Sequence, residues 1–173
     1  MLDLLHKNYI VQKGFMSTVH AVTNDQNSVD GTHKKGNASR RGRTAGMNII
    51  PTSTGAASAI GNVIPDLNGK LDGSSFRVPV GDGSLIDLTV DVEATVDVEM
   101  VNKLFKSSIS EVFGVTEDPI VSSDIIGNIH GCVVDLALTK VVDDHMIKVV
   151  AWYDNEMGYT AQMLRTLLYF CKL

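Results

Sequence analysis

The chain has little of several residue types that define whole classes of protein. Its 173 residues include two cysteines and one tryptophan. Cys132 and Cys171 lie far apart, without C-x-x-C or metal-ligand spacing. This argues against a disulfide framework or a metal site, and both thiols are expected to be reduced, as in a cytosolic protein. No apolar run approaches the ~20 residues of a membrane span. The N-terminus lacks the basic region of a signal peptide, so the expected location is cytoplasmic, away from any membrane.

Basic charge is also scarce. Fifteen Lys and Arg residues face 20 Asp and Glu residues, which gives a net charge of -5 and argues against nucleic acid as a partner. One cluster departs from this balance and consists of His33, Lys34, Lys35, Arg40, Arg41 and Arg43. It could bind phosphates or nucleic acid, but such a run is more typical of a solvated loop, and the interleaved aromatic residues of an RNA-binding surface are missing.

Alternation of apolar and polar side chains gives the clearest structural signal. Residues 86–93 alternate with a period of two, which predicts a strand with one buried face. We expect a preceding strand at 74–80, joined to it as a hairpin by the turn Gly81-Asp82-Gly83. Apolar spacing and turn signals predict strands at 10–23, 134–138 and 146–153, and helices at 1–8, from 52–55 through 63, from Thr95 as the cap, and at 156–173.

This order of elements predicts a single α+β domain over 1–173. Its largely antiparallel or mixed sheet should be covered on one face by helices. Residues 24–46 are expected to form a long basic loop, a length that usually marks a functional or disordered segment. The helix at 156–173 is more apolar than one free face requires, so it is expected to pack on something further.

His20 is the first candidate for acid–base chemistry. It ends the apolar, strand-like run STVHAVT, just before a polar segment. An imidazole ionises near neutral pH, so it can take a proton and later return it. The alternative is a histidine with purely structural hydrogen bonds at a strand end. The other histidines lack ligand spacing.

Two further features are consistent with anion binding. Thr52-Ser53-Thr54-Gly55 opens a predicted helix, where free N–H groups and the helix dipole favour an anion. A plain N-cap by a hydroxyl explains the same residues. Arg77 lies in a predicted strand and must find a carboxylate, a phosphate or solvent. A base, a phosphate cradle and a cation together suggest chemistry on a phosphorylated substrate, although no nucleophile motif is recognisable.

Five stretches in order along nearly the whole chain resemble the C-terminal catalytic domain of phosphorylating glyceraldehyde-3-phosphate dehydrogenases. They are STVHAVTNDQ, IIPTSTGAA, LNGKL, FRVP and WYDNE. In that family a cysteine attacks the aldehyde, a hydride passes to NAD, and phosphate cleaves the thioester. The resemblance implies a cytoplasmic glycolytic enzyme acting on a phosphorylated aldehyde. It also implies a homo-oligomer in which the loop at 24–46 reaches a neighbouring subunit's cofactor.

The resemblance also implies a role for each matching residue. His20 corresponds to the base that activates the thiol. The other assignments are Thr23 and Arg77 for the substrate phosphate, Thr54, Gly55 and Arg41 for inorganic phosphate, Asn155 for the nicotinamide amide and Tyr159 for an aromatic neighbour of that ring. Asp154 or Asn155 could equally serve as a helix cap, and Arg77 could form a structural ion pair.

The family's nucleophile is missing from these matching stretches. It lies in Ser-Cys-Thr-Thr-Asn just before the first helix, and so would fall immediately upstream of Met1. No G-x-G-x-x-G occurs, so no dinucleotide-binding domain is expected in this chain. The chain is therefore expected to be inactive alone and to bind NAD weakly or not at all. It should also self-associate if no partner covers its exposed apolar surface.

Two other functions are compatible with the same residues. One is a non-catalytic structural or partner-binding remnant that keeps the sheet for association with dehydrogenase subunits. The other is an erythrose-4-phosphate dehydrogenase-like domain, which shares these motifs. The sequence leaves open which aldehyde phosphate is used and whether the cofactor is NAD or NADP.

Overall fold

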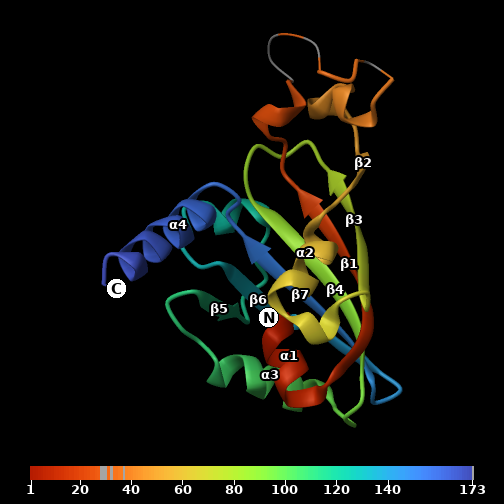
Figure 1. Ribbon diagram of the computed structural model, residues 1–173, viewed down its shortest axis with the longest axis vertical. Coiled ribbons are helices and arrows are strands. Elements are labelled where there is room, and N and C mark those ends of the chain that lie inside the picture. The colour runs from red at the N-terminus through yellow and green to blue at the C-terminus, as the bar shows by residue number, and fades with distance from the viewer. Residues whose placement is uncertain (28–30, 32, 37, 173) are drawn as a thin grey trace.

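A mixed β-sheet runs through the centre of the molecule (Figure 1). The computed structural model describes residues 1–27, 31, 33–36 and 38–172. Within them the sheet has seven strands in the order β2-β3-β1-β4-β7-β6-β5. In chain order the helices and strands are α1 (Leu2–Tyr9), β1 (Val11–His20), β2 (Ile50–Ser53), α2 (Ala56–Val63), β3 (Leu71–Arg77), β4 (Ser84–Val92), α3 (Val98–Ser107), β5 (Phe113–Thr116), β6 (Cys132–Val142), β7 (Met146–Tyr153) and α4 (Met157–Phe170).

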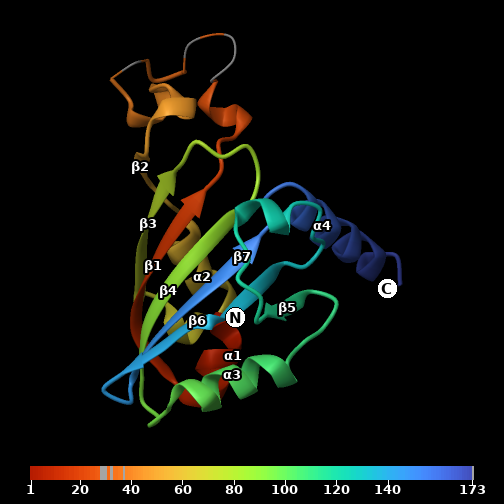
Figure 2. The same cartoon turned by 180° about the vertical axis from the view of Figure 1, so that it is seen from behind.

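Helices cover one face of the sheet. Helices α1 and α2 lie in front of the strands in Figure 1 and behind them in Figure 2, and α3 packs beside α1. Leu5 of α1 and Phe105 of α3 are fully buried against Leu88 and Val90 of β4 and Val149 of β7. The alternation along 86–93 places Leu88 and Val90 on this face, as their spacing predicts. The expected α+β class, with helices on one face of a mixed sheet, is confirmed.

The expected hairpin between the strands on either side of Gly81-Asp82-Gly83 is wrong. β1 lies between them, parallel to β3 and antiparallel to β4. The connection passes over the end of β1, where Val22 donates its N–H to Val80 and Val78 donates to His20. The first strand also begins and ends earlier than expected, at Leu71–Arg77 rather than at 74–80.

Other local expectations have mixed outcomes. The hairpin of β6 and β7 is confirmed, with Asp143 and Asp144 in the left-handed region that Asp tolerates in turns. Thr95 does not cap α3, because Asp97 is the N-cap and accepts a hydrogen bond from the Met100 N–H at 2.7 Å. At α2 the N-cap is Gly55 rather than a hydroxyl residue.

Two segments extend from this compact part. The described residues of the expected loop at 24–46 lie beyond the ends of β1, β2 and β3 (Figure 1). They include 3₁₀ helices at Asn24–Gln26 and Arg40–Gly42 and the start of another at Ala45–Met47. Residues 28–30, 32 and 37 of this loop lie outside the described part of the chain. Helix α4 extends away from the sheet at one side and carries the C-terminal end. No helix within the described residues is long and apolar enough to cross a membrane.

Candidate active site

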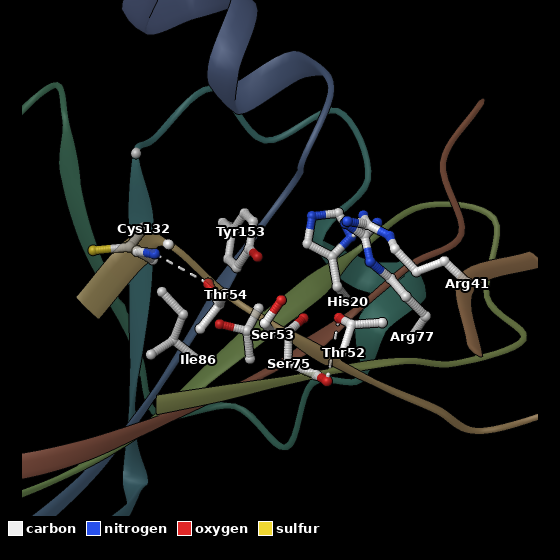
Figure 3. Close-up of a pocket in the computed structure, with 14 residues that line it drawn as sticks. His20, Arg41, Thr52, Ser53, Thr54, Ser75, Arg77, Ile86, Cys132 and Tyr153 are labelled. Atoms are coloured by element: carbon white, nitrogen blue, oxygen red, sulfur yellow. Dashed lines mark hydrogen bonds between the residues drawn. The ribbon is translucent and has the colours of Figure 1, made fainter. Parts of the chain in front are cut away.

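A hollow of about 490 Å³ lies on the helix-covered face, where β1, β3 and β7 all end. These strands finish with His20, Arg77 and Tyr153, and parallel alignment puts their last side chains at one edge of the sheet. Figure 3 shows these three side chains together with those of β2 and of Arg41. The remaining walls are formed by Thr18, Arg41, Thr52, Ser53, Thr54, Gly55, Ala56, Ser75, Ile86, Gly131 and Cys132.

His20 and Arg77 are brought together by strand register. They are direct partners in the parallel pairing of β1 with β3, although they lie 57 positions apart in the sequence. Nη1 of Arg77 lies 3.0 Å from Nδ1 of His20 and donates hydrogen bonds of 3.0 Å to the Ala21 carbonyl and to Oγ1 of Thr23. A single nitrogen of the guanidinium thus links the candidate base to the candidate phosphate ligand.

Nδ1 of His20 has two polar contacts. It lies 2.8 Å from the Ala21 carbonyl, which can only accept, and 3.0 Å from Nη1 of Arg77, which can only donate, so the two contacts favour opposite tautomers. With the proton on Nδ1, the two Nη1 hydrogens of Arg77 serve the Ala21 carbonyl and Thr23. This tautomer leaves Nε2 unprotonated, which is the form that a general base needs.

Electrostatics act in the same direction. Burial lowers the pKa of His20 below its usual range, and the positive charges of Arg77 and Arg41 lower it further. The Ala21 carbonyl and the Glu156 carboxylate partly offset this effect on the pKa. At neutral pH the imidazole is therefore neutral and able to accept a proton.

The turn between β2 and α2 supplies the donor-rich wall. The N–H of Ala56, the first residue of α2, donates to Oγ1 of Thr54 at 3.1 Å. This bond fixes the hydroxyl of Thr54 at the start of the helix, where the dipole and the first N–H groups favour negative charge. Arg41 faces the same hollow and pairs with Asp25 at 3.1 Å. The turn and the arginine together form a wall rich in hydrogen-bond donors.

A hydrogen-bond chain ties Asn155 to the base. The hydroxyl of Ser84 donates to Oδ1 of Asn155 at 2.7 Å and accepts from the N–H of Ala21 at 3.1 Å. This fixes the amide orientation of Asn155, whose Nδ2 makes a long 3.5 Å contact with Glu156. The ring of Tyr153 lies edge-on to His20, with centroids 6.0 Å apart, and burial raises the pKa of its hydroxyl.

The predicted site residues therefore do not all meet in one place. The hollow is lined by His20, Arg77, Thr54, Gly55 and Arg41. Thr23 contacts it through Arg77, and Asn155 adjoins it through Ser84. Tyr159 lies on α4, 71% exposed and outside the hollow, so its role stays a prediction.

Sequence reasoning missed three contributors. Ser84 reaches Ala21, and Tyr153 reaches His20, through the register of β4 with β7 and of β1 with β4, which no local pattern shows. Cys132, for which the sequence predicts only a reduced thiol, lines the hollow. Burial raises the pKa of its thiol, so it is protonated at neutral pH and poorly suited to act as a nucleophile. Within the described residues no group of three His, Cys, Asp or Glu side chains could hold a metal ion.

Comparison with known proteins places the chain among the catalytic domains of dehydrogenases. Residues 1–155 match the family described as glyceraldehyde 3-phosphate dehydrogenase, C-terminal domain, and the chain belongs to this family. Similar proteins include the glyceraldehyde-3-phosphate dehydrogenases of Clostridium acetobutylicum, 52% identical, and of Clostridium pasteurianum and Streptococcus pyogenes, each 51% identical. Each alignment covers 100% of this chain and 52% of the relative. The chain thus spans about half the length of the curated relatives it matches.

Proposed function

We propose that the chain provides the base and the phosphate sites of a cytoplasmic, glycolytic glyceraldehyde-3-phosphate dehydrogenase. Such an enzyme oxidises an aldehyde phosphate to an acyl phosphate, with NAD and inorganic phosphate as co-substrates. The observation that carries the proposal is the pairing of His20 with Arg77 at the ends of β1 and β3, with Nη1 3.0 Å from Nδ1. This pairing puts a neutral base beside a cation within one hollow.

The two anion-binding walls suit two different phosphates. Arg77 and Thr23, already joined at 3.0 Å, would hold the phosphate of the aldehyde substrate. Thr54, Gly55 and Arg41 would hold the inorganic phosphate that attacks the acyl group. His20 lies beside Arg77 and lines the same hollow as Thr54 and Gly55, so its Nε2 would take the proton of the attacking thiol or phosphate and return it later.

Asn155 fits the cofactor's amide. With its Oδ1 held by Ser84, its Nδ2 can donate to the carbonyl of a nicotinamide carboxamide and fix which face of the ring points at the substrate. NAD supplies the acceptor for the hydride when it is bound. The described residues offer no glycine-rich turn for its pyrophosphate, so the chain's own contribution to cofactor binding is confined to the nicotinamide end.

The phosphate sites can be tested on the chain itself. Titration with orthophosphate should shift the amide NMR signals of Gly55 and Ala56 at the start of α2. Arg77→Gln should weaken binding of glycerol phosphate about tenfold or more, because it removes a charge-assisted donor. The exposed Arg43→Gln is the matched control and should leave this binding unchanged. Equal weakening by both variants would show that only the net charge matters.

The isolated chain is expected to make no NADH from glyceraldehyde 3-phosphate, NAD and phosphate. The thioester route needs a thiolate, whereas burial keeps Cys132 protonated and Cys171 is exposed at the end of α4, away from His20. The measurement is the absorbance of NADH over hours at high protein concentration. NADH formation that disappears in His20→Gln would contradict the inactivity of the chain and would require a nucleophile within it.

A second candidate function, association with a partner, is favoured by α4. Its exposed apolar side chains are Met157, Tyr159, Met163, Leu164, Leu167, Leu168, Tyr169 and Phe170. So many exposed apolar side chains on a single helix normally indicate a surface that contacts another protein. Binding to dehydrogenase subunits, including further copies of this chain, would cover it. Erythrose 4-phosphate remains an alternative substrate, which a side-by-side rate comparison on an assembled enzyme would test.

A further inference from the structure

Strand β1 loses one of its two neighbours just before it reaches the candidate base. Its ladder with β4 ends at Val19, whereas its ladder with β3 continues to His20. The next residue, Ala21, is fully buried, so its N–H cannot bond to water and needs an acceptor within the protein. An acceptor other than the backbone of β4 is therefore required.

The hydroxyl of Ser84, the first residue of β4, supplies this acceptor. It accepts the N–H of Ala21 at 3.1 Å, and Ser84 is only 2% exposed. At the other end of the same peptide unit, the carbonyl of His20 accepts the N–H of Val78 at 3.0 Å. The peptide unit next to the imidazole is thus held from both sides, and one of its two anchors is a side chain.

The same hydroxyl interacts with two further residues of the site. A serine hydroxyl has one proton to donate and two lone pairs with which to accept. One lone pair takes the N–H of Ala21, and the proton goes to Oδ1 of Asn155 at 2.7 Å. The second lone pair remains for the phenol of Tyr153, which is the register partner of Ser84 and interacts with it. One buried hydroxyl thus serves three groups around the candidate base.

We propose that Ser84 is a positioning residue that couples the nicotinamide end of the cofactor site to the candidate base. This inference rests on the proposed function, in which His20 takes the proton and Asn155 binds the nicotinamide carboxamide. In such an oxidation the hydride and the proton leave the same substrate, so the groups that hold the ring and the base must keep a fixed relative position. A hydroxyl bonded to both sides maintains this position, and polarised hydrogen bonds transmit a change at one end to the other.

The test is an NMR titration of the ¹⁵N-labelled chain with acid. Protonation of the His20 ring should shift the side-chain amide signal of Asn155 with the same midpoint, because the new charge polarises the hydrogen bonds through Ala21 and Ser84. Ser84→Ala removes this link and should reduce the shift about threefold or more, while the His20 ring still titrates. Thr89→Ala removes a hydroxyl further along β4 and is the matched control, which should leave the shift unchanged.

Glu156 offers a second route to the same signal, which a further variant excludes. Its carboxylate affects the pKa of His20 and lies 3.5 Å from Nδ2 of Asn155. Arg77 and Arg41, the other charged neighbours of the ring, keep their charge throughout the titration. The Asn155 shift at the His20 midpoint should therefore persist in Glu156→Gln.

The outcomes separate this proposal from the proposed function. No Asn155 shift at the His20 midpoint in the unaltered chain, an undiminished shift in Ser84→Ala, or loss of the shift in Glu156→Gln would overturn the role of Ser84. Titration with nicotinamide should shift the Asn155 side-chain amide, and should shift the Ala21 amide in the unaltered chain but not in Ser84→Ala. A nicotinamide titration without effect on Asn155 would instead contradict the cofactor role of Asn155 in the proposed function.

Discussion

His20 couples the protonation of the site to the stability of the fold. Burial and the charges of Arg77 and Arg41 lower its pKa in the folded chain below the unfolded value near 6.5. Between these two pKa values the unfolded chain binds more protons, so the free energy of unfolding must rise with pH there. The contribution of neutral His20 to the free energy of unfolding is complete above the pKa of the unfolded chain. It is lost as the pH falls toward the pKa of the folded chain.

Substitution of this imidazole gives the first stability prediction. His20→Gln should flatten the pH dependence of the free energy of unfolding below about pH 6.5, because the group responsible for it no longer titrates. Urea unfolding at several pH values measures this, and an NMR titration of the His20 ring gives the pKa itself. A ring that titrates above 6.5 would contradict the neutral base.

Asp154 organises the junction between β7 and α4. Its buried carboxylate accepts the N–H groups of Gly127, Glu156 and Met157 at 2.7 to 2.8 Å. Burial alone would raise its pKa, but these three hydrogen bonds outweigh burial and hold the pKa below its usual range. Its contribution to stability is therefore present above the unfolded pKa near 3.9 and is lost as the pH falls through the folded value.

Removing the charge of this cap should destabilise the chain. Asp154→Asn is expected to cost about 2 kcal/mol at pH 7, because the backbone donors lose a charged acceptor at a helix start. Urea unfolding measures the cost. The neighbouring Glu156→Gln removes an exposed carboxylate and should cost less than about 0.5 kcal/mol. Similar costs for the two variants would show that the cap contributes no more than surface charge.

At the residue scale, the sequence identifies a functional residue more readily than it identifies the residues in contact with it. His20 and Arg77 stand out because each belongs to a recognisable stretch, and strand pairing then brings them together. Ser84 could not be found, since a serine at the start of a strand has no distinctive pattern. Its function depends on two strand registers at once. Asp97 replaces Thr95 as a cap because the helix begins at Val98, two residues later than a cap at Thr95 requires.

At the scale of elements, the sequence predicts where strands occur better than it predicts which strands are adjacent in the sheet. The β6–β7 pair follows from a short turn between two apolar runs. The same reasoning fails for β3 and β4, because β1, which lies 50 residues or more earlier in the chain, lies between them. Gly83 makes this crossing possible. It has a φ of 87°, and the Ser122 carbonyl lies where a side chain would be, so only glycine fits.

At this scale we predict that the chain self-associates through helix α4. Leu164 and Leu168 lie four residues apart on one face and are 52% and 59% exposed. Leu164→Gln/Leu168→Gln should reduce self-association without lowering the free energy of unfolding, since neither side chain is in the core. Sedimentation velocity measures the first quantity and urea unfolding the second. Ile109→Gln/Val121→Gln removes two other exposed apolar side chains and should leave the association unchanged.

Two results would contradict a role for α4 in association. If the isolated chain is monomeric at high concentration, or if both double variants reduce association equally, α4 is not the surface through which the chain associates. The sequence already indicated an excess of apolar residues at 156–173, which α4 at Met157–Phe170 bears out. That surplus is visible in the composition of the helix, whereas its exposure depends on how the helix leaves the sheet.

At the scale of the whole molecule, most of the groups proposed for chemistry lie at one edge of the sheet. The base, the substrate-phosphate arginine and the phosphate turn come from β1, β3 and the β2–α2 junction. Their assembly depends on the mixed strand order, so it could be expected only from the family resemblance. The chain aligns with 52% of its relatives' length, and the thiol and the nucleotide-binding domain are expected from the part it does not match.

The most direct measurement is therefore on a chimera. The part of the Clostridium acetobutylicum relative that this chain does not match would be fused ahead of it, and NADH formation assayed with glyceraldehyde 3-phosphate, NAD and phosphate. We predict activity that requires phosphate and falls by about 10²-fold or more in His20→Gln. A folded, NAD-binding chimera that forms no NADH, or one indifferent to His20, would contradict the assignment of the base and phosphate sites to this chain.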